Sequence, residues 1–229
     1  MDAAQRKISR IKESLPTSNL KSDDTKFIAE LVHYIGCING RNKLQVSIHD
    51  SFNTRYKVII AQMPEINIDD VRQVELMNSR IKSMQIDLVR GYLIIESWKI
   101  GKVGKTSKKK RGREIDEYVD LPNSFNLDKV DKNDIRQIEG ILKLFLNATD
   151  LEFNVKLEQT ETYYEVILSR LEIMDISKID TVLSAYKAFV NQIYVDYPKK
   201  QLRVLVRKSD TPLESIAPYR RKLKVIKKD

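Results

Sequence analysis

One stretch of the chain carries the residue types on which catalysis without histidine could depend. In DLEFNVKLE, the polar residues Glu152, Asn154 and Lys156 alternate with apolar neighbours. Side chains two residues apart leave the same face of a β-strand, so all three share one face. Downstream, Arg203 extends from the alternating stretch LRVLVRK. Any reaction that this chain catalyses would therefore use carboxylate, lysine and arginine groups.

Histidine and cysteine offer little further chemistry. His33 lies in an amphipathic helical pattern and His49 at a strand end, and neither has a cysteine or an acidic motif at ligand spacing. The pattern argues against a histidine-based metal centre and a Ser-His-Asp triad, and we expect no metal and no cofactor. Cys37 is the only cysteine, which excludes an internal disulfide and fits a reducing compartment.

A basic run at residues 102–113, KVGKTSKKKRGR, contains seven cations and no acid. It includes Gly104-Lys105-Thr106, but a phosphate-binding P-loop needs a glycine five positions earlier, where the chain has Lys99. No helical pattern follows either, so we reject a P-loop. Three interpretations stay open: an arm that binds phosphate, a nuclear localisation signal, or a solvated loop.

The net charge of +9 is concentrated in two short segments. Residues 99–113 contribute +8 and residues 219–229 contribute +5, so the remainder of the chain is mildly acidic. Such a distribution indicates a polyanion partner, and we expect nucleic acid, either RNA or DNA. The candidate nucleic-acid-binding residues are Lys102, Lys105, Lys108, Lys109, Lys110, Arg111, Arg113, Arg220, Arg221, Lys222 and Lys224.

Hydrophobic periodicity predicts an α+β fold in which one helix-ββαββ unit occurs twice in tandem. The two copies would form antiparallel sheets, either packed together or closed into a pseudo-two-fold barrel. After a helix at 3–15, the first copy has helices at 22–39 and 68–84 and strands at 43–49, 55–63, 85–90 and 91–98. The second copy has helices at 132–146 and 176–190 and strands at 151–157, 163–171, 192–197 and 200–208.

The two copies match in register at a nearly constant offset. Asn67 and Asp175 take the N-cap position of equivalent helices. The matched core positions are Leu44, Val46 and Ile48 with Phe153, Val155 and Leu157, and Tyr56, Val58 and Ile60 with Tyr164, Val166 and Leu168. The chain then divides into an N-terminal basic helix (1–20), a first repeat (21–100), a basic and acidic linker (101–131), and a second repeat with a basic tail (132–229).

Several strands are apolar on both faces. The apolar residues opposite the expected core are Ile59, Ile94, Trp98, Ile167 and Leu205. A sheet with one wet face would place polar residues there, so we expect something to cover the second face. The cover could be the other repeat, the inside of a barrel, or a protein partner such as a second copy of the chain.

Four stretches of the second half, LEFNVKL, ISKIDTVLSAYKAF, VDYPKKQLRVLV and YRRKLKVIKK, resemble the triphosphate-tunnel family. This family includes the mRNA-capping RNA triphosphatases of viruses and fungi. The resemblance covers residues 150–228 and implies a tunnel of strands in which Glu152, Lys156 and Arg203 bind triphosphate. The family has a second glutamate where this chain has Asn154, so the resemblance implies phosphate binding without hydrolysis.

We therefore expect a non-enzymatic, nucleic-acid-associated or assembly protein, whose folded body contacts other proteins and whose basic segments bind polyanions. One alternative is an RNA 5′-triphosphatase-like enzyme, or an inactive partner of a capping enzyme. Another is a structural subunit of a virus particle or of another large complex. The charged N-terminus and the absence of a run of ~20 apolar residues predict no secretory signal and no membrane span. The expected location is intracellular, in the cytoplasm or the nucleus.

Overall fold

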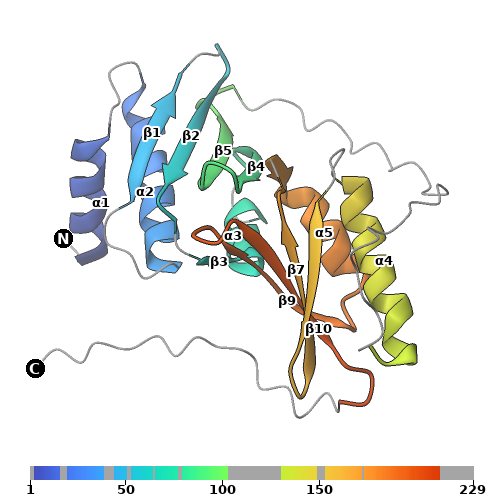
Figure 1. Ribbon diagram of the computed structural model, residues 1–229. Coiled ribbons are helices and arrows are strands. Elements are labelled where there is room, and N and C mark those ends of the chain that lie inside the picture. Colours follow the sequence, from blue (N-terminus) through green and yellow to red (C-terminus); the bar gives the residue numbers. More distant parts are fainter. Residues whose placement is uncertain are drawn as a thin grey trace, which may run out of the picture.

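The computed structural model confirms an α+β fold with two five-stranded antiparallel sheets (Figure 1). The sheets are not closed into a barrel, so the alternative of two packed sheets holds. Among the described residues, no helix combines the length and the apolar character needed to span a membrane. The structure describes residues 3–15, 20–38, 44–50, 53–63, 65–76, 79–102, 130–148, 153–171 and 173–211.

The element order of the first half recurs in the second half. After α1 (Ala3–Ser14), the first half has α2 (Ser22–Ile38), β1 (Gln45–His49), β2 (Arg55–Ala61), β3 (Glu65–Asn67), α3 (Ile68–Leu76), β4 (Ile81–Asp87) and β5 (Tyr92–Trp98). The second half has α4 (Lys132–Ala148), β6 (Asn154–Gln159), β7 (Tyr163–Ser169), β8 (Ile173–Asp175), α5 (Ile176–Ala185), β9 (Val190–Asp196) and β10 (Gln201–Arg207). The predicted duplication is confirmed.

Each half donates a short edge strand to the sheet of the other half. The first sheet has the order β1-β2-β5-β4-β8, and the second has the order β3-β9-β10-β7-β6. In the first sheet Met174 of β8 pairs with Ile86, and in the second Ile66 of β3 pairs with Val195. This exchange was not expected from the sequence, because three-residue strands are too short to show an alternating pattern.

The local backbone geometry of the two halves also repeats. The Asn67 side chain accepts the Asp69 N–H at 2.9 Å, and the Asp175 side chain accepts the Ser177 N–H at 2.9 Å, which confirms both predicted caps. Gln62 and Arg170, at equivalent positions after β2 and β7, have φ angles of 57° and 64°. Non-glycine residues seldom take this left-handed conformation, so its recurrence shows that the turn itself is repeated.

Two predicted helices are too long. The helix expected at 68–84 is α3, which ends at Leu76, and Ile81 already begins β4. The helix expected at 176–190 is α5, which ends at Ala185, and Val190 begins β9. In both places apolar residues continue at helical spacing into the next strand, so periodicity alone extends the helix too far.

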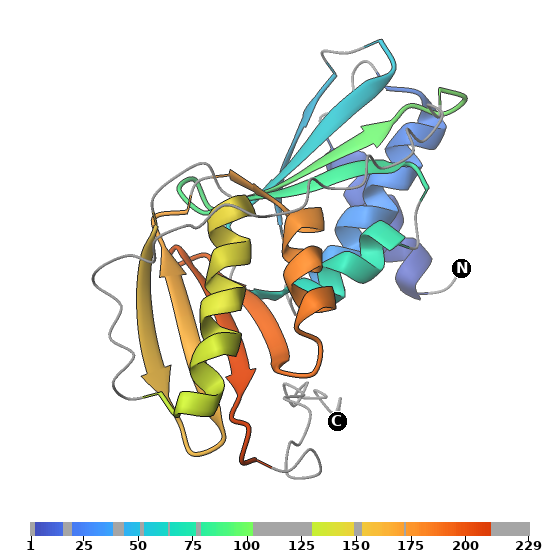
Figure 2. The same cartoon turned by 90° about the vertical axis from the view of Figure 1, so that its right-hand side faces the viewer.

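One face of each sheet packs on helices, with α2 and α3 against the first sheet and α4 and α5 against the second (Figure 2). α3 and α5 contact each other, and each also contacts a strand of the other half's sheet. The apolar residues on the inner faces form one core that is continuous across the two halves. The predicted core matches are confirmed for Tyr56, Val58, Ile60, Tyr164, Val166 and Leu168, which are all buried.

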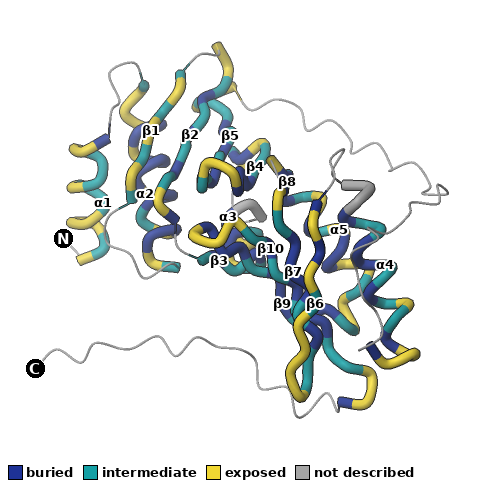
Figure 3. Tube along the Cα trace, viewed as in Figure 1, coloured by how far each residue is buried: buried dark blue, intermediate teal, exposed yellow. Residues whose placement is uncertain are grey.

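The outer face of each sheet is partly exposed. Along β2 and β5 the residues alternate strictly between buried and intermediate, as Figure 3 shows. Ile59, Ile94 and Trp98 lie on the intermediate side, whereas Ile167 of the second sheet is buried. Of the three covers considered, the structure excludes the inside of a barrel, and the partial exposure of Ile59, Ile94 and Trp98 shows that the described residues do not bury this face of the first sheet. A protein partner stays a prediction.

Candidate functional site

Most of the basic residues singled out in the sequence lie outside the described part of the chain. Lys102 is described: it is exposed and its N–H donates to the Lys99 carbonyl at 3.0 Å, just beyond the end of β5. The candidates outside the described residues are Lys105, Lys108, Lys109, Lys110, Arg111, Arg113, Glu152, Arg220, Arg221, Lys222 and Lys224.

Lys156 and Arg203 lie on the outer face of the second sheet, and each cation contacts a carboxylate. Both residues pair with Ile167 of β7, one from each side. The Arg203 guanidinium is 2.8 Å from Glu165, which also accepts a hydrogen bond from the Tyr194 hydroxyl at 2.5 Å. The Lys156 ammonium is 2.6 Å from Glu158.

The charges of Lys156 and Arg203 are balanced by the neighbouring carboxylates of Glu158 and Glu165. Burial and the hydrogen bond to Glu165 raise the pKa of Tyr194, so its hydroxyl keeps its proton. Burial opposes the charge of Arg203, but the hydrogen bond with Tyr194 and the charge of Glu165 prevail and raise its pKa. A phosphate would have to compete with carboxylates already in contact, so Lys156 and Arg203 do not form a prepared anion site.

A second cationic group lies on the outer face of the first sheet. Three cations contact a single carboxylate, that of Glu96, and we name these four residues the Glu96 cluster. The Glu96 carboxylate is 3.2 Å from Arg55, 3.8 Å from Lys57 and 2.9 Å from Lys82. These four residues together carry a formal charge of +2.

The sheet itself brings these four side chains together. Arg55 and Lys57 are two residues apart on β2, and Lys57 pairs directly with Glu96 of β5. Lys82 comes from β4 on the other side, at a register shift between Ile81 and Ser83. A β-bulge of this kind re-aims a side chain, and here it lets Lys82 reach the outer face.

The cations of the cluster decide the ionisation of Glu96 and remain accessible themselves. Burial alone would raise the pKa of Glu96, but Lys82, Arg55 and Lys57 together hold it below the ordinary value of 4.5. Glu96 is therefore an anion at neutral pH. Its side chain is 15% exposed, against 38% for both lysines, so solvent reaches the cations more easily than the carboxylate.

Trp98 lies beside the cluster at the end of β5. The Arg55 guanidinium carbon is 5.9 Å and the Lys82 ammonium 6.0 Å from the centre of the indole ring. These distances allow cation–π attraction to both groups. Trp98 is followed within four residues by Lys102, so the basic run at 102–113 begins at the same end of the strand.

The second half repeats the backbone of this site without its charges. A register shift recurs between Leu205 and Val206 of β10, opposite β9. However, the residues equivalent to Arg55, Lys57, Lys82, Glu96 and Trp98 are Tyr163, Glu165, Asn191, Leu205 and Arg207. The cluster is therefore not a consequence of the repeated fold.

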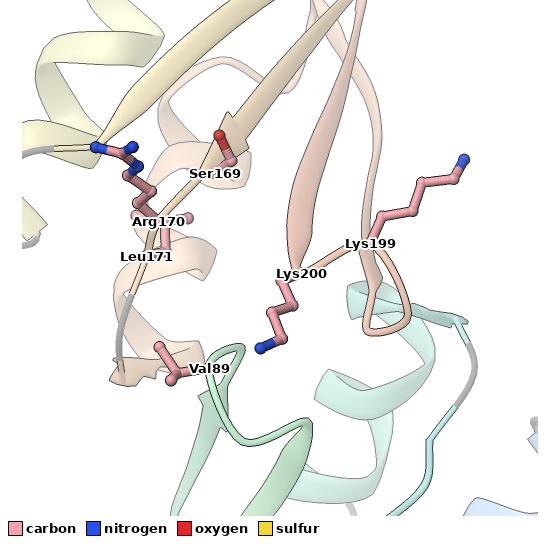
Figure 4. A pocket seen from close by; sticks show the side chains of 6 residues that line it. All are labelled: Val89, Ser169, Arg170, Leu171, Lys199 and Lys200. Carbon is pink, nitrogen blue, oxygen red and sulfur yellow. The ribbon is translucent and has the colours of Figure 1, made fainter.

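A pocket of about 400 Å³ lies between the two halves. It is lined by Val89, Ser169, Arg170, Leu171, Lys199 and Lys200 (Figure 4). Lys200 extends toward the turn that carries Val89, but Arg170 and Lys199 extend away from it, and Lys199 pairs with Asp196 at 3.4 Å. The three cations do not converge, so this pocket is a weaker candidate than the Glu96 cluster.

Within the described ranges, no group of three or more His, Cys, Asp and Glu residues could hold a metal ion. Comparison of the chain with protein-family models, curated proteins and solved structures gave no significant match. The resemblance to the triphosphate-tunnel family therefore stays a prediction, and the open sheets of the described residues do not form the tunnel that it implies.

Proposed function

We propose that the protein is a non-enzymatic nucleic-acid-binding protein that uses the outer face of its first sheet together with its basic segments. The observation that carries the proposal is the Glu96 cluster, which has three cations around one carboxylate beside a half-buried tryptophan. Lysine and arginine side chains supply most of the affinity of proteins for nucleic acid, through contacts with phosphate.

The position of the cluster also supports the proposal. The basic run at 102–113 begins four residues after Trp98. The cations of the Glu96 cluster and those of the basic run could therefore contact the same polyanion. Lys102, the described residue of that run, is exposed. The remainder of the chain is mildly acidic, which would direct a polyanion toward this region.

The test compares two variants of the full chain that carry the same change in net charge. The first variant combines Arg55→Gln, Lys57→Gln and Lys82→Gln with Glu96→Gln, so that no half-buried carboxylate is left without its partners. The control combines Lys156→Gln with Lys200→Gln, both exposed on the second half. Binding of a labelled oligonucleotide is measured by fluorescence anisotropy over a range of salt concentrations.

We expect the cluster variant to bind more weakly and to lower the slope of log K against log salt by about 2, at ~0.7 for each single-strand phosphate contact. The control should keep the slope of the parent protein. Deletion of residues 102–113 should lower it further while leaving the melting temperature nearly unchanged. If the parent does not bind at low salt, or if both variants behave alike, the proposal is wrong.

A further inference from the structure

We infer that the outer face of the first sheet binds single-stranded nucleic acid, with one base stacked on Trp98. This inference rests on the proposed function and deepens it, because it names the form of the nucleic acid and the residue that contacts a base. It does not follow from charge alone, since the phosphates of single strands and of duplexes are both attracted to the cations of the cluster.

The arrangement around Trp98 fits a nucleotide better than it fits an isolated phosphate. Arg55 on β2 and Lys82 on β4 reach the indole ring from the strands on either side of β5. Both cations lie over the ring, so a base that stacks there would take their place, and the displaced cations could bind the phosphates that precede and follow it. Surfaces that bind single strands combine such aromatic platforms with cationic grooves.

Apolar residues continue along the same face of β5. Tyr92 and Ile94 precede Glu96 and Trp98 on the same side of the strand, and both are half-buried. Ile59 of β2 pairs with Ile94 and adds to this surface. The face thus has an apolar centre and a cationic end, which suits the exposed bases of a single strand. In a duplex the bases are stacked on each other and unavailable.

The equivalent place in the second half is occupied by contacts within the chain. Arg207 stands where the first half has Trp98, and its guanidinium donates to the Thr211 carbonyl at 2.7 Å and the Ala188 carbonyl at 3.2 Å. The duplicated fold therefore presents one platform, on the first sheet, among the described residues.

Charge favours nucleic acid over a second copy of the chain as the occupant of this face. In a symmetric dimer formed through this face, two clusters of +2 would approach each other, and like charges placed together oppose association. A polyanion would neutralise the cluster instead. The experiment therefore treats self-association as a contrary outcome.

The chain contains a single tryptophan, so its fluorescence reports directly on the proposed contact. The full chain is titrated at low salt with a dT oligonucleotide and with a duplex of equal length, and tryptophan emission is recorded. We expect the single strand to quench the emission and the duplex to bind without comparable quenching. Trp98→Leu should weaken binding of the single strand by roughly fivefold or more without changing the salt slope, because no phosphate contact is lost.

Trp98→Phe is the matched variant, since phenylalanine keeps an aromatic face and should retain most of the affinity. It also keeps the test valid if Trp98→Leu fails to fold, which circular dichroism would reveal. The stacking inference would be overturned if the single strand and the duplex quenched the emission equally, or if Trp98→Leu kept full affinity for the single strand. Either result would leave the proposed function intact. Absence of binding to either form would overturn both. Emission that changes with protein concentration alone would assign the face to a second copy.

Discussion

At the scale of single residues, two buried aspartates show how the halves differ within one plan. Asp24 and Asp134 lie at the beginning of α2 and of α4, with 1% and 2% of their surface exposed. Each accepts the backbone N–H just beyond the last strand of its half, from Ile100 at 2.9 Å and from Ser209 at 3.1 Å. Asp24 also forms an ion pair with Arg80, which lies over the Phe27 ring.

This difference predicts unequal costs for the same substitution. Asp24→Asn keeps an acceptor for Ile100 but takes the counter-ion from the half-buried Arg80, so it should destabilise the protein by about 3 kcal/mol or more. Asp134→Asn keeps an acceptor for Ser209 and takes the counter-ion from no cation among the described residues, so it should cost about 1 kcal/mol. Urea denaturation of the two variants measures both values, and equal losses would contradict the assigned role of the ion pair.

The candidate site could be predicted only in part from single residues. The alternation in RYKVIIA places Arg55 and Lys57 on one face, and the same reasoning placed Trp98 opposite the core. Lys82 could not be assigned, because residues 68–84 read as one helix and the bulge that directs Lys82 has no sequence signal. The cluster is incomplete without Lys82, so it could be recognised only after the structure showed how β4 pairs with β5.

At the scale of elements, the short strands β3 and β8 decide how the halves are joined. Long strands and helices were predictable because alternation or helical spacing runs through at least five residues in each. β3 and β8 have three residues each, and their pairing partners lie in the other half. No local pattern can specify a partner more than 80 residues away, which is why the exchange was missed.

The exchange predicts that a substitution in the second half destabilises the first sheet. Met174 of β8 is 4% exposed and pairs with Ile86 in that sheet. Met174→Ala should cost about 2–5 kcal/mol, because it leaves a cavity in the shared core. Ile173 on the same strand is 49% exposed, so Ile173→Ala should cost well under ~1 kcal/mol.

Thermal unfolding followed by Trp98 fluorescence measures this effect, since Trp98 belongs to the first sheet. Met174→Ala should lower the melting temperature seen by Trp98, whereas Ile173→Ala should leave it nearly unchanged. A Trp98 transition that ignores Met174→Ala would show that β8 does not stabilise the first sheet.

At the scale of the whole molecule, the halves meet around a pseudo-two-fold axis. Arg72 of α3 and Asp180 of α5 occupy equivalent positions, and they form an ion pair 2.9 Å long where the two helices meet. The Tyr197 hydroxyl donates to the Tyr92 carbonyl at 3.4 Å, which also joins the halves. With the exchanged strands and the continuous core, these contacts make the two repeats one folding unit.

This unity predicts the behaviour of the separated halves. Without its partner, a fragment of residues 1–102 would lack β8 and leave Ile86 at a bare sheet edge. A fragment of residues 130–229 would lack β3 and expose Val195 in the same way. Each fragment alone should therefore show no cooperative thermal transition, and an equimolar mixture should regain one, because both edge strands return at once.

Circular dichroism during heating measures both states, and an analytical size-exclusion column should show the mixture as a 1:1 complex. A cooperative transition in either isolated fragment, near the melting temperature of the intact chain, would mean that the repeats are independent domains that merely touch.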